Sequence, residues 1–198
     1  MMRTIQITLL TLALAGALQG CVAPVIVGAG ALMVADRRTT GAYIEDESIE
    51  NKSLSQILAK YKNNAGVHVN VTSYNRHALI TGEVPDEAVK ADVAAIVSAQ
   101  GNVRGTTNEL TISGATSLTS RSNDTLLTSN VKARFLGNKV FSPNHVKVIT
   151  ENGTVFLMGL VCQPEANAAA EIASTSSGVQ RVVKVFENIE CPPPPAKH

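Results

Sequence analysis

The second half of this chain repeats the pattern of its first half, and this repeat constrains the fold more than any other feature. Alternating apolar and polar residues flank a short turn in each copy, at 67–71 and 78–84 and again at 146–148 and 155–161. The second turn holds Asn152-Gly153, a dipeptide typical of a tight hairpin. Gly82 and Gly159 occupy equivalent places, 77 residues apart. The sequence therefore predicts two β-hairpins in two copies of one folded unit.

A helix and a last strand are predicted after each hairpin. The helices cover 88–100 and 166–176, and the last strands cover 103–112 and 179–189. Each helix opens near a proline with acids beside it, Pro85 or Pro164, which suits a helix N-terminus. Gly101 and Gly178 are expected to end the two helices.

Another helix is predicted before each hairpin. Apolar residues at helical spacing mark these segments: Ile49, Leu54, Ile57, Leu58 and Tyr61 in the first copy, and Leu127, Val131 and Phe135 in the second. Asp124 is expected to cap the second of these helices. Each copy then has the order αββαβ. Because a strand-helix-strand connection is right-handed, both helices should pack on one face of a three-stranded mixed sheet.

The predicted fold class is α+β, with two tandem domains. The expected boundaries are a signal peptide 1–20, a tether 21–45, domains 46–112 and 124–191, a linker 113–123 and a proline-rich tail 192–198. The linker is assigned from its Ser, Thr and Gly content, and the tail from its run of prolines.

The first twenty residues have the layout of a secretory signal, with Arg3 followed by a short apolar run. The run ends at Gly20-Cys21, which resembles the lipobox of bacterial lipoproteins, where the cysteine thiol is acylated. Val22 stands where an aspartate would signal retention in the inner membrane. We therefore expect lipidation at Cys21 and an outer-membrane address facing the periplasm. The alternative is a cleaved secretory signal with an incidental cysteine.

Between Cys21 and the first domain lies an apolar segment, 22–35, followed by Arg37 and Arg38. Fourteen residues are too few to cross a bilayer as a helix. We interpret the segment as a tether. The alternative is a segment resting on the membrane surface, with Arg37 and Arg38 at the lipid headgroups.

Charge and cysteine content narrow the function. Removal of residues 1–20 takes away one basic residue, Arg3, and leaves 16 basic and 16 acidic residues. A neutral chain argues against nucleic acid as a partner. Cys162 and Cys191 end two strands that would finish on the same side of the sheet, so an oxidising compartment favours a disulfide between them. The alternative is a buried Cys162 that acts as a small apolar residue.

The repeated unit, with "ITGEV" and "LMGLV" around its glycines and Gly178-Val179 further on, resembles the BON domain. Two such domains behind a lipobox resemble the dual BON-domain outer-membrane lipoproteins of Gram-negative envelopes. The resemblance implies a protein without catalytic activity whose second domain binds anionic phospholipid and supports envelope integrity, in association with cell division. The family's lipid-contacting helix corresponds here to Thr125, Leu126, Lys132 and Arg134, with Lys139 adjoining.

The residues of the second domain suit this expectation. Residues 125–150 contain four basic side chains and no acid: Lys132, Arg134, Lys139 and Lys147. Leu126 and Leu136 lie off the predicted core stripe and could insert into a bilayer surface. Alternatively, they could pack against the first domain. The rival function is a lipoprotein adaptor for an envelope-assembly or peptidoglycan-remodelling protein, and the acidic first helix makes the first domain the better protein-contact module.

No enzyme is predicted. His68, His77 and His145 are scattered, without helical pairing or an evident carboxylate partner, so no metal site is expected. The chain has no Gly-x-Ser-x-Gly, His-Glu-x-x-His or Walker sequence. We accordingly expect no cofactor and no small-molecule substrate.

Overall fold

The computed structural model of the chain describes residues 36–113 and 118–191. From Arg37 onward the chain forms one compact unit. The signal peptide, Cys21, the segment 22–35 and the tail 192–198 lie outside the described residues. Among the residues that are described, no helix is both long enough and apolar enough to span a membrane.

The first copy contains the predicted helix-strand-strand-helix-strand order. Its elements are α3 (Thr40–Tyr61), β1 (His68–Tyr74), β2 (His77–Val84), α4 (Glu87–Ser98), β3 (Gly105–Asn108) and β4 (Thr111–Ile112). Strand β2 is central: it pairs with β1 in antiparallel fashion and with β3 and β4 in parallel. The sheet is therefore mixed, as predicted.

The second copy repeats this order. Its elements are α5 (Leu118–Leu136), the 3-10 helix η1 (Pro143–His145), β5 (Lys147–Glu151), β6 (Thr154–Val161), α6 (Gln163–Ser174) and β7 (Arg181–Asn188). Strand β6 is central, antiparallel to β5 and parallel to β7. Two α+β units with mixed sheets confirm the predicted fold class.

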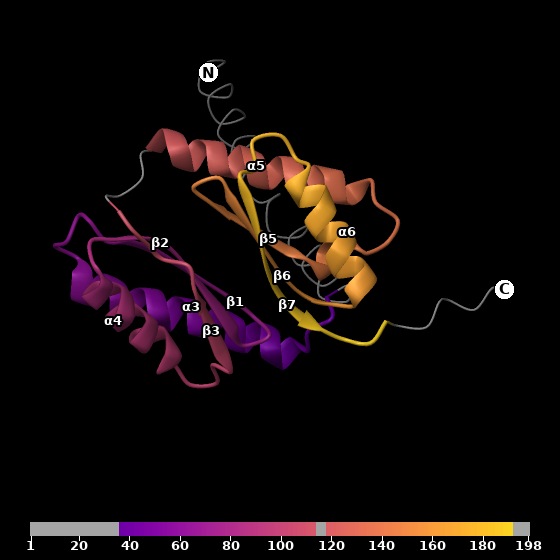
Figure 1. Ribbon diagram of the computed structural model, residues 1–198. Coiled ribbons are helices and arrows are strands. Elements are labelled where there is room, and N and C mark those ends of the chain that lie inside the picture. The colour runs from indigo at the N-terminus through magenta and orange to yellow at the C-terminus, as the bar shows by residue number, and fades with distance from the viewer. Residues whose placement is uncertain (1–35, 114–117, 192–198) are drawn as a thin grey trace, which may run out of the picture. The chain divides into compact units, whose positions relative to one another are not determined.

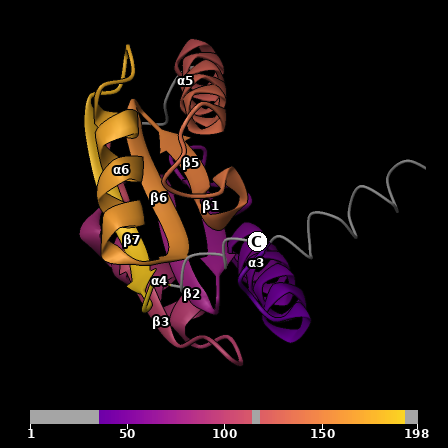
Figure 2. The ribbon, with the colours of Figure 1, turned by 90° about the vertical axis from the view of Figure 1, so that its right-hand side faces the viewer.

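Each pair of helices covers one face of its own sheet. In the second copy, Val131 and Phe135 of α5 and Ala169 of α6 are buried with Val148 and Leu157 of the sheet. The corresponding core of the first copy joins α3, α4 and the sheet. Figures 1 and 2 show α5 and α6 beside β5, β6 and β7.

The last strand of the first copy is interrupted, whereas a continuous strand 103–112 was predicted. Glu109 and Leu110 separate β3 from β4. The Asn108 side chain accepts a hydrogen bond from the Leu110 amide at 3.1 Å, which competes with regular strand pairing. The interruption places Leu110 in the core, where it is buried.

The opposite faces of the two sheets pack together. Leu79 of β2 lies in one buried apolar cluster with Phe156, Met158 and Leu160 of β6. Polar contacts flank this cluster, including Lys147 Nζ to Glu50 Oε1 at 3.0 Å. The two domains therefore share a sheet-to-sheet interface.

Both hairpins close through the same two-residue turn. Asn75 and Arg76 have φ values of 51° and 66°, and Asn152 and Gly153 have 47° and 72°. Positive φ at both central residues defines the type I′ turn, whose twist suits a two-residue hairpin.

An aspartate from the preceding helix binds each turn. Asp46 of α3 accepts the amides of Asn75 and Arg76 at 2.8 and 2.7 Å. Asp124 of α5 accepts the amides of Asn152 and Gly153, both at 2.8 Å. We refer to Asp46 and Asp124 as the turn-binding aspartates. They fasten each first helix to the tip of its hairpin.

The capping role predicted for Asp124 is therefore wrong. Helix α5 begins at Leu118, so Asp124 lies inside the helix, where its side chain is buried. Residues 118–123 accordingly belong to the helix and not to a linker. Likewise, α3 begins at Thr40, so 40–45 are helical where a tether was expected.

Gly82 and Gly159 each allow a close approach of two backbone segments. A Cβ added to Gly82 would collide with the carbonyl oxygen of His68, and one on Gly159 with that of His145. Both strands therefore approach a neighbouring backbone too closely for any side chain. The two glycines lie 77 residues apart because this close contact occurs at the equivalent place in each copy.

The segment before α3 is fastened to both domains. Arg37 forms a two-bonded ion pair with Glu165, at 2.6 and 2.9 Å. Arg38 pairs with Asp46 at 2.8 Å, and both partners are largely buried. These contacts contradict the alternative in which Arg37 and Arg38 lie at the lipid headgroups, because their guanidinium groups are held by protein carboxylates.

Candidate functional site

Helix α5 has a buried face and an outward face. Leu127, Val131 and Phe135 are buried against the sheet, as their spacing predicted. Leu126 and Leu136, by contrast, are 68% and 75% exposed. At about 100° per residue, these two leucines lie roughly 80° apart on the side away from the core.

The alternative that Leu126 and Leu136 pack against the first domain is contradicted. Both are among the exposed large apolar side chains, together with Val140 at 55% exposure just beyond the helix. The domains meet instead through the opposite faces of their sheets. We call Leu126, Leu136 and Val140 the exposed apolar row.

Basic side chains flank the exposed apolar row. Lys132 and Lys139 are exposed, and neither forms a hydrogen bond or ion pair with the residues that the structure describes. The hydroxyl of Thr125 donates to the Arg121 carbonyl at 3.1 Å. The one acid of α5 is Asp124, which is buried and bound to the hairpin turn. The outward face of α5 thus combines apolar and basic groups without an acid.

The other two basic residues of this segment have protein partners. Arg134 donates to the carbonyl of Ile172 and the hydroxyl of Ser176, at 2.6 and 2.7 Å. Its guanidinium therefore binds the last turn of α6, where a cation is favoured by the helix dipole. Lys147 pairs with Glu50 across the domain interface. Of the four predicted basic residues, Lys132 and Lys139 have no such partner within the described part of the chain.

Cys162 and Cys191 form a disulfide in the structure, with their Cα atoms 5.1 Å apart. Strands β6 and β7 are parallel neighbours, so the residues that follow them emerge at the same edge of the sheet. Cys162 also precedes α6, where its amide donates to Glu165 at 3.0 Å.

Glu165 joins this edge of the sheet to the segment before α3. Burial acts to raise the pKa of its carboxyl. Hydrogen bonds from Arg37 and the Cys162 amide, with the charges of Arg37 and His145, outweigh burial and hold the pKa below its ordinary value. The ionised Glu165 belongs to the second domain, and Arg37 lies directly before α3 of the first domain. Their ion pair therefore connects the two domains.

Two of the histidines have carboxylate neighbours, contrary to the prediction. His68 Nδ1 lies 3.1 Å from Glu83 Oε2, and His145 Nδ1 lies 3.8 Å from Glu165 Oε1. Neither partner is near in sequence, since one comes from the opposing strand and the other from α6. Local spacing could not reveal them.

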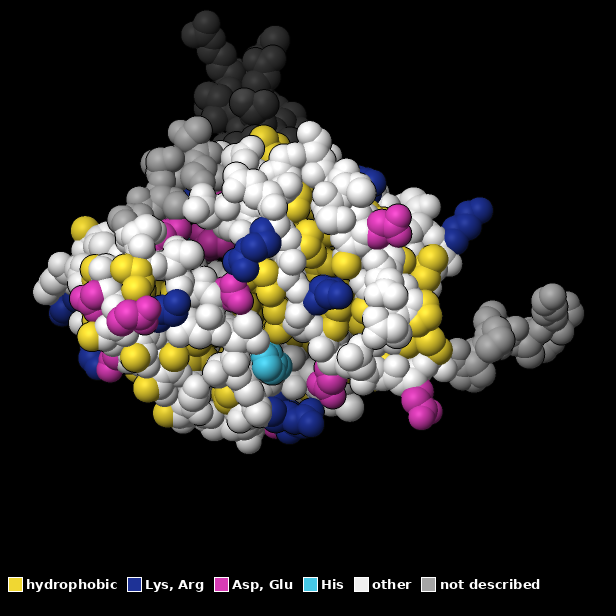
Figure 3. All heavy atoms as spheres, viewed as in Figure 1, with side chains coloured by type: hydrophobic (Ala, Val, Ile, Leu, Met, Phe, Trp, Pro, Cys, Tyr) yellow, Lys and Arg dark blue, Asp and Glu magenta, His cyan; other side chains and the backbone are white. Residues whose placement is uncertain are grey.

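His77 borders a cavity of about 460 Å³ between the two domains. Burial lowers the pKa of His77, and the charge of Glu187 acts in the opposite direction. Its Nε2 lies 2.8 Å from the Thr107 hydroxyl. Arg104, Lys184 and Glu187 also line the cavity, so both signs of charge face it. Figure 3 shows acidic and basic side chains interspersed on the face of the molecule that is viewed there.

Two copies of one helix-hairpin-helix-strand unit, behind an N-terminal lipobox-like sequence, define a tandem-domain envelope lipoprotein. Residues 45–114 and 123–188 match the BON domain family. The chain belongs to this family and is a DolP-like outer-membrane lipoprotein with two BON domains.

Several relatives resemble the chain over most of its length. Outer membrane lipoprotein DolP of Haemophilus influenzae is 43% identical over 176 residues, which cover 87% of this chain and 91% of the relative. A 21 kDa hemolysin of Actinobacillus pleuropneumoniae is 29% identical, covering 78% and 80%. Osmotically-inducible protein Y of Escherichia coli is 26% identical, covering 78% of each chain. None of these names denotes an enzyme.

Proposed function

We propose that this protein is a non-enzymatic lipoprotein, anchored through acylated Cys21 and facing the periplasm, whose second BON domain binds anionic phospholipid. In this role it supports outer-membrane integrity and the maintenance of the envelope during cell division. The observation that carries the proposal is the outward face of α5. Its exposed apolar row lies beside Lys132 and Lys139, with no acid on the helix surface.

The energetics favour weak, shallow binding. A leucine that is fully removed from water contributes about 1.5–3 kcal/mol, and each lysine near an anionic leaflet contributes about 1 kcal/mol. Partial insertion of Leu126 and Leu136 with two lysines therefore yields a few kcal/mol. Such an affinity is sufficient only when another attachment keeps the domain close to the membrane.

The acyl anchor would provide that attachment. The chain advances sixteen residues from Cys21 to Arg37, a reach of at most about 55 Å. This length permits α5 to meet the bilayer surface in which the anchor is embedded. Multivalency then makes a weak second contact effective.

The proposed lipid-contacting residues divide into two roles. Thr125, Leu126, Lys132 and Lys139 are exposed and can meet headgroups or acyl chains. Arg134 is better suited to hold α5 against α6, because its guanidinium is bonded to Ile172 and Ser176.

Vesicle co-sedimentation tests the proposal on the chain from residue 22 onward, which lacks the acyl anchor but keeps Arg37 and Arg38. We expect binding to vesicles that contain phosphatidylglycerol and none to purely zwitterionic vesicles. Leu126→Glu combined with Lys132→Glu should abolish binding. Leu58→Glu is the matched control, since Leu58 is a 66% exposed leucine on α3. Equal binding by all three proteins would refute the proposed α5 site.

The rival function is an adaptor that recruits an envelope-assembly or peptidoglycan-remodelling protein. One observation favours it: Ile44 and Leu58 of α3 are 62% and 66% exposed. They lie fourteen residues apart and so about 40° apart around the helix. Under this alternative, Leu58→Glu would disrupt envelope function while Leu126→Glu would leave it intact.

A further inference from the structure

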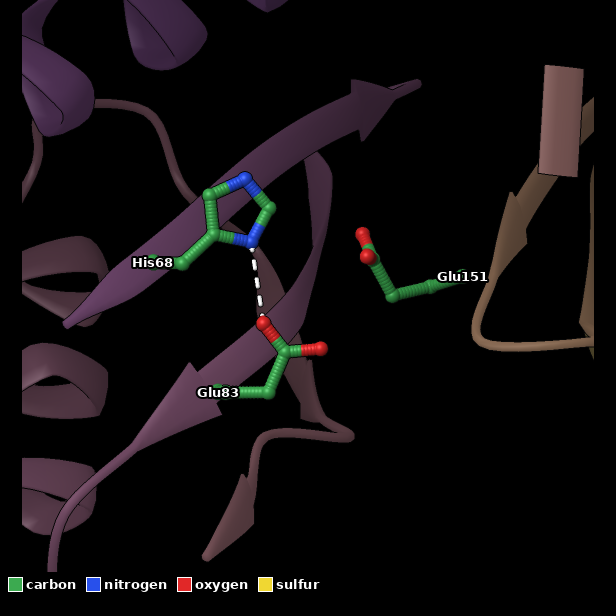
Figure 4. A group of neighbouring side chains, drawn as sticks. All are labelled: His68, Glu83 and Glu151. Carbon is green, nitrogen blue, oxygen red and sulfur yellow. Dashed lines mark hydrogen bonds and ion pairs between the residues drawn. The ribbon is translucent and has the colours of Figure 1, made fainter. Parts of the chain in front are cut away.

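Three side chains that can ligate a metal ion lie together where the two domains meet. His68 begins β1, and Glu83 lies directly opposite it on β2. Glu151 ends β5 of the second domain. One potential ligand atom from each residue lies within 4.8 Å of the other two. Figure 4 shows the three side chains converging from the two sheets.

Glu83 is the unusual member of this cluster. Its side chain is 1% exposed. One carboxylate oxygen, Oε2, lies 3.1 Å from His68 Nδ1, and the other, Oε1, has no hydrogen-bond partner among residues 36–113 and 118–191. A buried carboxylate oxygen without a donor is costly, typically about 1–3 kcal/mol or more. In Figure 4 this carboxylate and that of Glu151 face a common space.

Glu151 adds a second carboxylate to the same place. It accepts a hydrogen bond from Asn70 at 2.8 Å, and the Thr81 hydroxyl lies 3.5 Å away. Burial raises the pKa of Glu151, and the neighbouring charge of Glu83 acts in the same direction. Two carboxylates and one imidazole thus lie together at a partly buried position.

The surroundings permit access by a small ion. A cavity of about 260 Å³ is lined by His68, Glu151, Arg121 and Asp124, among others. Asp124 is occupied by the two amides of the hairpin turn. Arg121 is the arginine among the described residues that line this cavity, together with the carboxylates of Asp124 and Glu151.

We propose that His68, Glu83 and Glu151 form a binding site for a divalent transition-metal ion of the Zn²⁺ type, which bridges the two BON domains. One imidazole and two carboxylates form a mixed nitrogen and oxygen set, which suits Zn²⁺. Mg²⁺ and Ca²⁺ prefer oxygen ligands alone. Zn²⁺ is usually four-coordinate, and sites with three protein ligands hold a water in the fourth position.

A bound Zn²⁺ would remove two unfavourable features of the cluster. It would coordinate the unpartnered oxygen of Glu83 and neutralise the repulsion between the two carboxylates. Zinc binds nitrogen and oxygen at about 2.0–2.2 Å, so Glu151 would have to draw closer to the His68–Glu83 pair. Because Glu151 immediately precedes the turn held by Asp124, the ion would tie the hairpin of the second domain to the sheet of the first.

The test measures Zn²⁺ binding by the full mature lipoprotein in detergent, using titration calorimetry and the change in melting temperature. We expect one Zn²⁺ per chain and a higher melting temperature in its presence. Glu151→Gln and His68→Gln should each weaken binding at least tenfold. Glu187→Gln is the matched control, because Glu187 is another carboxylate at the domain interface, bonded to Asn75 at 2.7 Å. Its Zn²⁺ affinity should equal that of the wild type.

Three outcomes would overturn the proposal: no saturable binding of one equivalent, binding that Glu151→Gln leaves unchanged, or Mg²⁺ or Ca²⁺ binding as tight as that of Zn²⁺. Glu151→Gln tests Zn²⁺ ligation by this cluster even if His68→Gln fails to fold. Glutamine keeps the size of the side chain and the oxygen that accepts from Asn70. Co²⁺ gives an independent readout in the wild type. Visible absorption bands that are lost in Glu151→Gln support ligation by this cluster, whereas their persistence contradicts it.

Discussion

The first helices of the two domains, α3 and α5, share an inner structure but differ on their outer faces. Each carries a buried aspartate, Asp46 or Asp124, that binds the two amides of a type I′ turn. Outside, α3 carries Glu45 and Glu47 near Ile44, while α5 carries lysine beside its exposed leucines and no surface acid.

This difference indicates where the two domains have separate tasks. The turn-binding aspartates and the close-packed glycines belong to the scaffold, so they recur in both copies. Surface charge does not affect the scaffold and can differ between copies. An anionic membrane would attract α5 and repel α3, which is why we place lipid contact on the second domain alone.

Replacing the turn-binding aspartates should cause the largest loss of stability, and the loss should differ between the two copies. Asp46 also pairs with the largely buried Arg38 and accepts from the Ser73 hydroxyl at 2.6 Å. We expect Asp46→Ala to lower the free energy of unfolding by about 4 kcal/mol, because it removes the carboxylate that pairs with the largely buried Arg38 guanidinium. Asp124→Ala should cost about 2 kcal/mol, for two orphaned amides. Urea denaturation measures both, and equal losses would show that the Arg38 pair contributes little.

The disulfide distinguishes the second domain from the first, which has no cysteine. Its cysteines lie 29 residues apart. Closing such a loop stabilises the folded state by about 3 kcal/mol in the chain-entropy model. Mass spectrometry with and without reductant should detect the bond in protein from the periplasm. The double variant Cys162→Ala, Cys191→Ala should then unfold at lower urea, and an unchanged midpoint would contradict this contribution.

The Arg37–Glu165 pair is expected to contribute more than an exposed pair. Arg37 and Glu165 side chains are 16% and 8% exposed, whereas Lys60 of the Lys60–Asp92 pair is 53% exposed. We predict a loss of about 3 kcal/mol in the free energy of unfolding for Arg37→Ala. Lys60→Ala should lose under about 1 kcal/mol. Similar losses in thermal or urea unfolding would mean that Arg37 does not fasten the segment before α3.

The Arg37–Glu165 pair should make the free energy of unfolding depend on pH. Because the folded pKa of Glu165 lies below its ordinary value of 4.5, its contribution to stability is present above that value. The contribution is lost as the pH falls through the folded pKa. The stability difference between wild type and Glu165→Gln should therefore be largest at pH 7 and shrink at about pH 3. A difference independent of pH would contradict the ionised pair.

Much of the fold could be predicted because it depends on local patterns. The hairpins follow from alternation and from Asn152-Gly153, and the helix faces follow from residues such as Val131 and Phe135. The start of α5 was missed because residues 118–123 are rich in Ser, Thr and Asn, which favour loops. The packing of α5 and the bond from Asp124 to the turn override that preference.

The site was predictable only in part. The exposure of Leu126 and Leu136 follows from their offset from the core stripe. The engagement of Arg134 with α6, and of Lys147 with Glu50, depends on how distant elements meet. A signal for the turn-binding aspartates was present, since Asp46 and Asp124 lie 78 residues apart, close to the 77-residue repeat. The contact of His68 and Glu83 with Glu151 requires the domain interface, which no local pattern encodes.

Fluorescence of a single tryptophan tests the lipid site most directly, because the chain contains no tryptophan of its own. Leu126→Trp and the control Leu58→Trp would be placed in the chain from residue 22 onward and mixed with phosphatidylglycerol-containing vesicles. We predict a blue shift of the emission for Leu126→Trp, as the indole enters an apolar environment, and no shift for Leu58→Trp. Neither protein should respond to zwitterionic vesicles. An unshifted Leu126→Trp spectrum, or an equal shift in both proteins, would contradict membrane contact through α5.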